Sequence, residues 1–298
     1  MAKAKRVKGE WKRLTVQAAA FLLMNPKLHH FFLGTIEQGK TKSVCVPGLN
    51  CYSCPAAIGA CPIGSLQNTM NGGWKKPAFP FYVLGFLILF GLTLGRWICG
   101  WLCPFGWVQD LVYRIPFFKK IRTFRFERYL RWLKYAVLGV LVIGLPLLSA
   151  FKGVLVPWFC KLLGPSGTLF GGIPLVLANP SLRGQLGFLF WWKVGVLASL
   201  LLLSLLISRP FCRYLCPLGA IYGMFNRIAL VHLRFDSEKC VDCGKCASVC
   251  PMGIDPKAQF NSAECIRCGR CARACPTDSL AVRFGLRMID DSHKKSTI

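Results

Sequence analysis

Acidic residues are scarce in this chain of 298 residues, which has 12 Asp and Glu against 38 Lys and Arg and a formal net charge of +26. The sequence contains four histidines and no Cys-x-x-Cys-His, which excludes covalent haem attachment of the c type. We expect no removable signal peptide, because the apolar run after the basic N-terminus stops at Met24 without a convincing cleavage site.

Apolar residues are abundant instead, at 54% of the chain with 22 Phe and a mean hydropathy of +0.45. This composition is too apolar for a soluble domain and indicates a membrane protein. A bilayer span needs about 20 residues. Three segments are long enough to cross: Pro80 to Ile98, Trp132 to Ala150 and Leu186 to Ser208. A fourth segment, Leu14 to Gly34, is a weaker candidate, and it is either a tilted or broken span or a helix that lies in the interface.

The positive charge is concentrated beside the apolar segments, which favours the positive-inside rule over nucleic-acid binding. Basic residues crowd the N-terminus 1–13 and the link 114–134, whereas the link 152–185 holds only three. The N-terminus, the link 114–134 and the C-terminal ferredoxin are then cytoplasmic, which requires an even number of crossings. We therefore expect four spans in a bacterial cytoplasmic membrane, with residues 114–134 at the lipid surface or facing an acidic redox partner.

Eight of the 17 cysteines form two tandem copies of one pattern, C-x2-C-x2-C-x3-C-P, over residues 240–251 and 265–276. This is the ligand run of a two-cluster bacterial ferredoxin, in which the fourth cysteine of each run ligates the other cluster. Paired zinc sites are the alternative, but structural zinc favours separated C-x2-C pairs. The predicted [4Fe–4S] ligand sets are Cys240, Cys243, Cys246 and Cys275 for cluster 1, and Cys265, Cys268, Cys271 and Cys250 for cluster 2.

The predicted fold class is an α-helical membrane protein of four transmembrane helices with a C-terminal α+β two-cluster ferredoxin domain. The basic N-terminus covers residues 1–13, and the membrane domain covers 14–230 with an extracytoplasmic cysteine loop at 35–78. The ferredoxin domain covers 231–284, and a tail follows at 285–298.

Two matching turns of the form C-x3-C-P-x-G follow apolar segments, each three residues after an arginine, Arg96 or Arg209. The spacing predicts two sulfurs one helical turn apart on one face, with the proline either ending the helix or opening its next turn. Together the turns offer four thiolates to one inner cluster. The alternative is that each cysteine is a small buried apolar residue. The four candidates are Cys99, Cys103, Cys212 and Cys216.

Degenerate copies of the turn occupy residues 57–64 and 160–167, where Ala57 and Gly164 stand in place of a cysteine. We predict that the two surviving cysteines join a C-x2-C pair in an outer four-thiolate set. Cys45 is spare in this assignment and is an alternative to Cys160. An oxidising outer side also permits Cys51–Cys54 or Cys45–Cys61 disulfides. The outer candidates are Cys51, Cys54, Cys61 and Cys160.

The paired turns and the terminal ferredoxin runs together resemble the membrane ferredoxin subunits of quinol dehydrogenases over roughly residues 80–280. The named relatives are the NapH-type subunit of periplasmic nitrate reductase systems and the membrane half of NosR-type proteins. The resemblance implies quinol oxidation linked to electron transfer with other redox subunits. The chain departs from it in having no room for the NosR-type flavin domain and in carrying Gly164 where related sequences often have cysteine.

We therefore expect a transmembrane electron conduit between a quinol pool or membrane partner and the cytoplasmic ferredoxin clusters. Whether the chain is itself an enzyme, and the direction of electron flow, stay open. Quinol oxidation requires a proton acceptor, and His29, His30 and Glu37 at the outer end of the first span are the candidates. Two alternatives remain: a redox-active maturation factor without quinol turnover, and a ferredoxin that is only anchored to the membrane.

Overall fold

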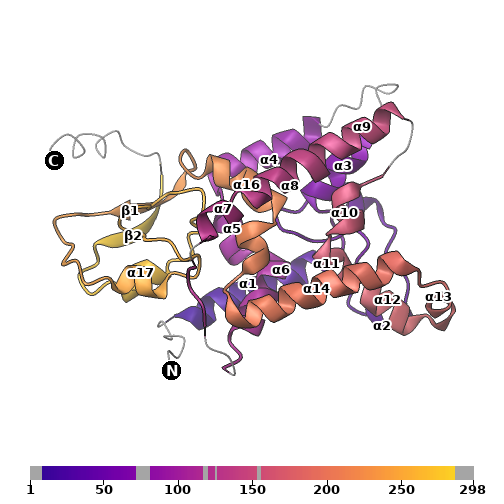
Figure 1. Ribbon diagram of the computed structural model, residues 1–298, viewed down its shortest axis with the longest axis horizontal. Helices are drawn as coiled ribbons and strands as arrows, with labels where there is room; N and C mark the ends of the chain where they lie inside the picture. The colour runs from indigo at the N-terminus through magenta and orange to yellow at the C-terminus, as the bar shows by residue number, and fades with distance from the viewer. Residues whose placement is uncertain (1–8, 72–80, 117–119, 125, 153–155, 286–298) are drawn as a thin grey trace.

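Figure 1 shows a computed structural model of the chain, which describes residues 9–71, 81–116, 120–124, 126–152 and 156–285. The predicted tail after residue 285, Pro80 at the start of the second span, and the basic residues Lys3, Lys5, Arg6, Lys8, Lys119 and Arg125 lie outside this part.

The described chain is mainly helical, with one two-stranded sheet at one end of the molecule (Figure 1). Strands β1 (Val231–Phe235) and β2 (Leu280–Phe284) pair antiparallel and bracket the two cysteine runs. The short helices α17 (Lys245–Val249) and α18 (Arg270–Ala274) contact each other there, and α12 (Ile173–Ala178) and α13 (Pro180–Arg183) form the opposite end of the molecule. The ferredoxin part therefore occupies one end of the molecule.

Two helices in the described chain are long and apolar enough to cross a bilayer. One is the continuous stretch Glu127–Phe151 of 25 residues, and the other is α14 (Phe188–Leu206) of 19 residues. Core helices of soluble proteins can meet the same criteria, but only 28% and 17% of these two apolar windows is buried. Large exposed apolar surfaces mark contact with lipid or with another protein. The longer stretch comprises α7 (Glu127–Leu130), α8 (Leu133–Val137), a π-helical segment (Leu138–Gly144) and α9 (Leu145–Phe151).

The other two predicted spans are short helices, so four crossings are not confirmed. Helix α1 (Glu10–Met24) begins four residues before the predicted start and is capped by Asn25, directly ahead of Pro26. A separate turn, α2 (His30–Leu33), follows it, which matches the broken version of the first span. Helix α4 (Phe81–Thr93) stops before Ile98, because Gly95 turns the backbone into the left-handed region with φ of +55°.

The two complete cysteine turns form the centre of the molecule. One comprises α5 (Trp97–Trp101) and α6 (Pro104–Tyr113), and the other α15 (Pro210–Tyr214) and α16 (Pro217–Phe225). Phe105 and Phe211 are fully buried between them, with ring centroids 5.2 Å apart in an edge-to-face arrangement. The remaining elements are the 3₁₀ helix Lys40–Ser43, α3 (Pro62–Asn71), α10 (Trp158–Leu162), α11 (Pro165–Gly167) and the π-helical Thr168–Gly172.

Candidate iron–sulfur sites

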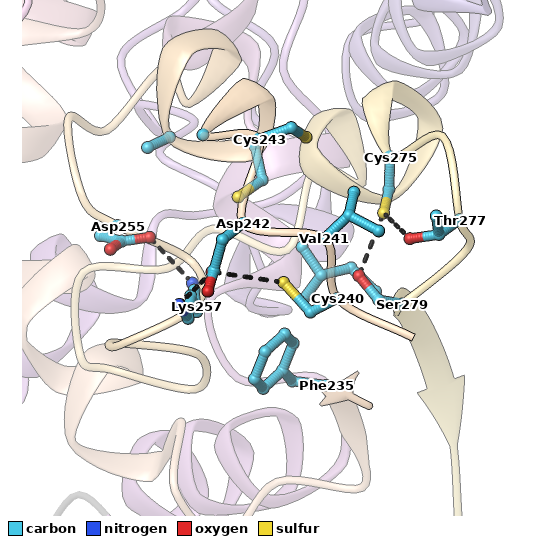
Figure 2. A pocket seen from close by; sticks show the side chains of 14 residues that line it. Phe235, Cys240, Val241, Asp242, Cys243, Asp255, Lys257, Cys275, Thr277 and Ser279 are labelled. Atoms are coloured by element: carbon cyan, nitrogen blue, oxygen red, sulfur yellow. Dashed lines mark hydrogen bonds and ion pairs between the residues drawn. The ribbon is translucent and has the colours of Figure 1, made fainter. Parts of the chain in front are cut away.

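The first ferredoxin site is a cavity of about 280 Å³ next to the sheet. Its four cysteines are three from the first run and the last one of the second run, the grouping predicted for cluster 1. Figure 2 shows the sulfur atoms of Cys240, Cys243 and Cys275 around the cavity, with Cys243 exposed to solvent. We call this group the distal site; it comprises Cys240, Cys243, Cys246 and Cys275.

Hydrogen bonds at Cys275 favour a thiolate. Burial raises the pKa of this thiol, but bonds to Ser279 (3.1 Å) and Thr277 (3.6 Å) outweigh burial and lower the pKa to about 7 (Figure 2). The thiolate is the form that ligates iron, so the local chemistry suits a metal ligand.

The second ferredoxin site is a smaller cavity of about 20 Å³, lined by the four cysteines predicted for cluster 2. Both runs fold alike, since Asp242 and Arg267 have φ of 49° and the glycines two residues later, Gly244 and Gly269, have φ of 65° and 71°. Successive residues of this kind turn backbone N–H groups toward an enclosed anion. We call this group the proximal site; it comprises Cys250, Cys265, Cys268 and Cys271.

The inner cysteines lie in turns that differ from the prediction. Cys99 belongs to α5, but Cys103 has an extended backbone and precedes α6, which Pro104 begins. Cys212, Cys216 and Pro217 repeat this arrangement. The expected placement of both sulfurs on one helical face is therefore wrong, whereas proline does start the next helix. Proline fits that position because its ring fixes φ and the first helical N–H needs no partner.

The fold nevertheless brings the four inner cysteines together in the core. All four are buried, with 4 to 7% of their surface exposed. The Cys216 sulfur is within electrostatic range of the other three. Two N–H donors reach sulfur directly: Gln109 Nε2 donates to Cys212 at 3.3 Å and the Gly219 amide donates to Cys216 at 3.3 Å. We call Cys99, Cys103, Cys212 and Cys216 the inner site.

The proximal site is held directly against the inner turns. Asn226 Nδ2, just beyond α16, donates to the Cys265 carbonyl at 2.7 Å, and Trp101 Nε1 donates to the Arg267 carbonyl at 3.2 Å. A Cβ at Gly100 would lie 2.4 Å from the Ile266 carbonyl oxygen, so only glycine permits this approach. The inner, proximal and distal sites therefore follow one another from the core to the surface of the ferredoxin end.

The outer cysteines are only partly gathered. Cys51, Cys61 and Cys160 line a cavity of about 420 Å³, whose wall also includes Lys193. Cys54 does not line it, because its thiol is fully buried and donates to Asn25 Oδ1 at 3.5 Å. Cys45 lies instead in the main core. All 17 cysteines are free thiols in the structure, and no group of three or more His, Cys, Asp or Glu in the described chain is close enough to hold a single metal ion.

The loop that carries these outer cysteines reaches the inner site, although the sequence-based topology puts the two on opposite sides. A Cβ at Gly48 would lie 3.0 Å from Pro104 Cδ, and Tyr222 donates to the Pro47 carbonyl at 3.2 Å. The Ser166 hydroxyl donates to the Leu49 carbonyl at 3.0 Å. Irregular backbone is tolerated deep in an apolar domain only where the protein satisfies its polar groups, and these bonds do so.

The quinol candidates form a cluster near the surface, outside the cavities described above. His29 and His30 have ring centroids 4.4 Å apart, and His30 Nε2 lies 3.3 Å from a Glu37 carboxylate oxygen. A hydrogen bond from Lys27 lowers the pKa of Glu37, which holds that group as a carboxylate.

The sequence reasoning missed several polar residues that surround the inner site. Arg96 and Arg209 were noted only for their position before each turn, whereas Gln109, Asp110 and Glu264 were not considered at all. The second turn repeats the first at a distance of 113 positions, including the arginine, both cysteines and the last glycine. An alignment of the two copies would therefore have identified the arginines as part of the repeated motif.

Family models for iron–sulfur proteins match three parts of the chain. A "4Fe-4S binding domain" matches residues 76–125 and 188–236, which carry the two inner turns. A "4Fe-4S dicluster domain" matches residues 232–276, which carry both ferredoxin runs. No solved structure matches the chain.

Curated relatives carry ferredoxin-type names. The methylamine utilization ferredoxin-type protein MauN of Methylorubrum extorquens is 32% identical over 63% of the chain and 59% of its own length. The ferredoxin-type proteins NapH of Haemophilus influenzae and Escherichia coli are 29% and 26% identical, over 55% and 64% of the chain and 51% and 59% of their own lengths. The chain spans about half to three fifths of the length of these relatives. The predicted resemblance to NapH-type ferredoxin proteins is confirmed.

Proposed function

We propose that this chain, which resembles the NapH-type ferredoxin proteins and contains 4Fe-4S domains, transfers electrons between a membrane-side donor or acceptor and the surface of its ferredoxin end. The single observation that supports this is the direct contact of the inner turns with the proximal site through Trp101 and Asn226. Iron–sulfur clusters, when bound at such sites, accept and release single electrons at potentials that the protein sets.

The residues around each site suit this task. Burial of the inner cysteines and of Cys268 and Cys271 at the proximal site excludes water from these thiolates. N–H donors from Gln109 and Gly219 stabilise negative charge on sulfur at the inner site. The exposed Cys243 opens the distal site to a partner, because electron exchange requires close approach.

The outer cavity extends the proposed series. Its three cysteines Cys51, Cys61 and Cys160 would hold a further group, with Cys54 as the fourth candidate ligand and Cys45 as the alternative to Cys160. Because the cysteine loop lies against Pro104, the separation from the inner site is much less than the hydrocarbon thickness of about 30 Å. Short separations favour tunnelling, so no further carrier between these two sites is required.

Membrane embedding in four crossings, with both termini cytoplasmic, belongs to the same proposal. The two long exposed apolar helices support two of the crossings. Helices α1 and α4 would complete the other two together with their neighbouring segments. Lipid, other redox subunits and quinol are the proposed partners. His30, whose Nε2 lies 3.3 Å from a Glu37 carboxylate oxygen, is the proposed proton acceptor for quinol oxidation, with His29 and Glu37 beside it.

Iron and sulfide counting on the purified full-length protein tests the proposal. Changing Cys99, Cys103, Cys212 and Cys216 together to serine should remove one cluster's worth of iron, about four atoms. A protein that holds only two clusters before and after this change is an anchored ferredoxin, and the proposal would fail. Reduction of the remaining clusters by a quinol analogue, followed by EPR, separates quinol oxidation from the maturation-factor alternative, which predicts no such reduction.

A further inference from the structure

Two fully buried arginines cross between the two inner turns. Arg96 precedes the first turn, and its Nη2 donates to the carbonyl of Cys212 in the second turn at 2.9 Å. Arg209 precedes the second turn, and its Nη1 donates to the carbonyl of Cys99 in the first. Each arginine therefore binds the turn that it does not precede, and the two contacts are related by the internal repeat.

The last glycine of each turn makes room for this crossing. A Cβ at Gly106 would lie 3.2 Å from Arg209 Nη1, and a Cβ at Gly219 would lie 3.2 Å from Arg96 Nη2. Both distances are tighter than ordinary van der Waals contact. The glycine in C-x3-C-P-x-G is thus explained by the arginine of the opposite turn.

The two arginines differ in their acidic partners. Arg209 forms a two-bond pair with Asp110, at 2.9 and 2.6 Å, and Arg13 also contacts that carboxylate at 2.9 Å. The repeat position of Asp110 is Gly223, where a Cβ would lie 2.8 Å from the Ala263 carbonyl. Arg96 donates there to the Ala263 carbonyl at 2.6 Å and to Glu264 at 3.2 Å, next to Cys265 of the proximal site. The ferredoxin end therefore supplies the partner that α16 lacks.

The conformation of Arg209 also indicates a specific role. Its φ of 52° is left-handed, which is costly for a residue with a side chain. Such a backbone persists only when its surroundings fix it, and it occurs preferentially at functional sites. Here the bonds to Asp110 and to the Cys99 carbonyl fix the side chain.

We propose that Arg96 and Arg209 are positioning residues that hold the two inner turns in register and raise the reduction potential of the inner site. This inference rests on the proposed function, because it requires a redox group held by the inner cysteines. Reduction adds one negative charge there, and a buried positive charge stabilises the reduced form more than the oxidised form. Each arginine is only partly neutralised, since Lys134 shares Glu264 with Arg96 and Arg13 shares Asp110 with Arg209.

An EPR-monitored redox titration of the full-length protein tests this inference. The inner signal is identified by its loss in the variant with all four inner cysteines changed to serine. In Arg96→Gln the reduced-to-oxidised ratio at the wild-type midpoint should fall about tenfold, which for one electron is a shift of about 59 mV to more negative potential. Asp110→Asn keeps the shape but removes negative charge, so its shift should be positive. Arg183→Gln, an exposed arginine on α13, is the control and should leave the midpoint unchanged.

The outcomes separate this inference from the proposed function. Wild-type iron sufficient for only the two ferredoxin clusters overturns both. Iron for the inner cluster with unmoved midpoints in Arg96→Gln and Asp110→Asn overturns this inference alone. If the Arg96→Gln variant does not assemble the inner cluster, the positive shift of the midpoint potential in Asp110→Asn tests the inference instead. Arg96→Lys should then restore assembly of the cluster, because lysine retains the positive charge. A negative or zero shift in Asp110→Asn would also overturn the role of charge.

Discussion

The inner and outer cysteine sites are built from the same local turn but are enclosed differently. At both, a helix begins with proline directly after the position of the second cysteine: Pro104 and Pro217 at the inner site, Pro62 and Pro165 at the outer. The inner turns are complete and crossed by two buried arginines, whereas the outer copies have lost a cysteine each and border a cavity of about 420 Å³.

This difference indicates that the turn supplies cysteines, whereas the residues around it determine how tightly the site is closed. The inner site is bordered by hydrogen-bonding side chains, among them Arg96, Gln109 and Arg209. The outer site is lined in part by glycines, among them Gly64, Gly167 and Gly171, and by Lys193. The inner site is suited to a permanently held group, and the outer site to a group reached from outside.

The largest expected effect concerns which cysteine completes the outer site. Cys160→Ser should remove about one cluster's worth of iron, because Cys160 lines the outer cavity, whereas Cys45→Ser should not. Iron and sulfide analysis of the two purified variants provides the measurement. If Cys45→Ser lowers the iron content and Cys160→Ser does not, the comparison of the two sites must be redrawn with Cys45 as the ligand.

The buried ion pairs of the inner site should matter far more than exposed pairs. Asp110→Ala leaves Arg209 and Arg13 without their carboxylate and should lower the free energy of unfolding by about 3–5 kcal/mol. Lys239→Ala breaks a pair whose lysine side chain is 64% exposed and should cost about 1 kcal/mol or less. Chemical unfolding in detergent compares the two, and equal losses would contradict the ranking.

The glycine that ends each turn offers a matched comparison of inner and outer sites. Gly219→Ala forces a methyl group toward Arg96 and should cost about 1–3 kcal/mol. Gly64 occupies the same motif position at the outer site, where a Cβ would make an ordinary contact 3.8 Å from the Cys160 sulfur. Gly64→Ala should therefore be neutral or stabilise α3 by up to about 1 kcal/mol. Thermal unfolding of both variants measures this, and a neutral Gly219→Ala would argue against the arginine crossing.

The smallest expected effect is a dependence of stability on pH that is confined to acidic pH. Burial alone would raise the pKa of Asp110, but Arg209 and Arg13 outweigh it and hold the pKa well below its usual range. A depressed pKa contributes stability above the unfolded value of about 3.9 and loses it as pH falls further. Between pH 8 and 5 the difference in stability between wild type and Asp110→Asn should stay constant, and it should shrink below about pH 4. A difference that changes between pH 8 and 5 would contradict this assignment.

Features that follow from the spacing of residues along the chain could be predicted from the sequence. The runs at 240–251 and 265–276 predicted which four cysteines share each ferredoxin cavity, including the exchange of Cys250 and Cys275. The long helices near 132–150 and 186–208 followed from apolar length alone. These features depend on local pattern, which a single sequence carries directly.

Features that depend on contacts between distant segments were not predictable in this way. The loop around Pro47 contacts Tyr222, 175 residues later, and no local sequence pattern predicts that contact. The single-helix expectation for Cys99 and Cys103 failed because the proline at 104 starts a new helix and leaves Cys103 extended. The partner of Arg96 comes from the ferredoxin end, and only the three-dimensional arrangement reveals it.

The origin of these partners has a consequence for how the chain is made. Arg96 and Lys134 are buried, yet their shared carboxylate, Glu264, is synthesised more than a hundred residues after each of them. A nascent chain therefore carries Arg96 and Lys134 without this carboxylate until residue 264 emerges from the ribosome. Synthesis of the ferredoxin end then supplies the missing carboxylate, so a chain truncated before Glu264 would leave Arg96 and Lys134 without it.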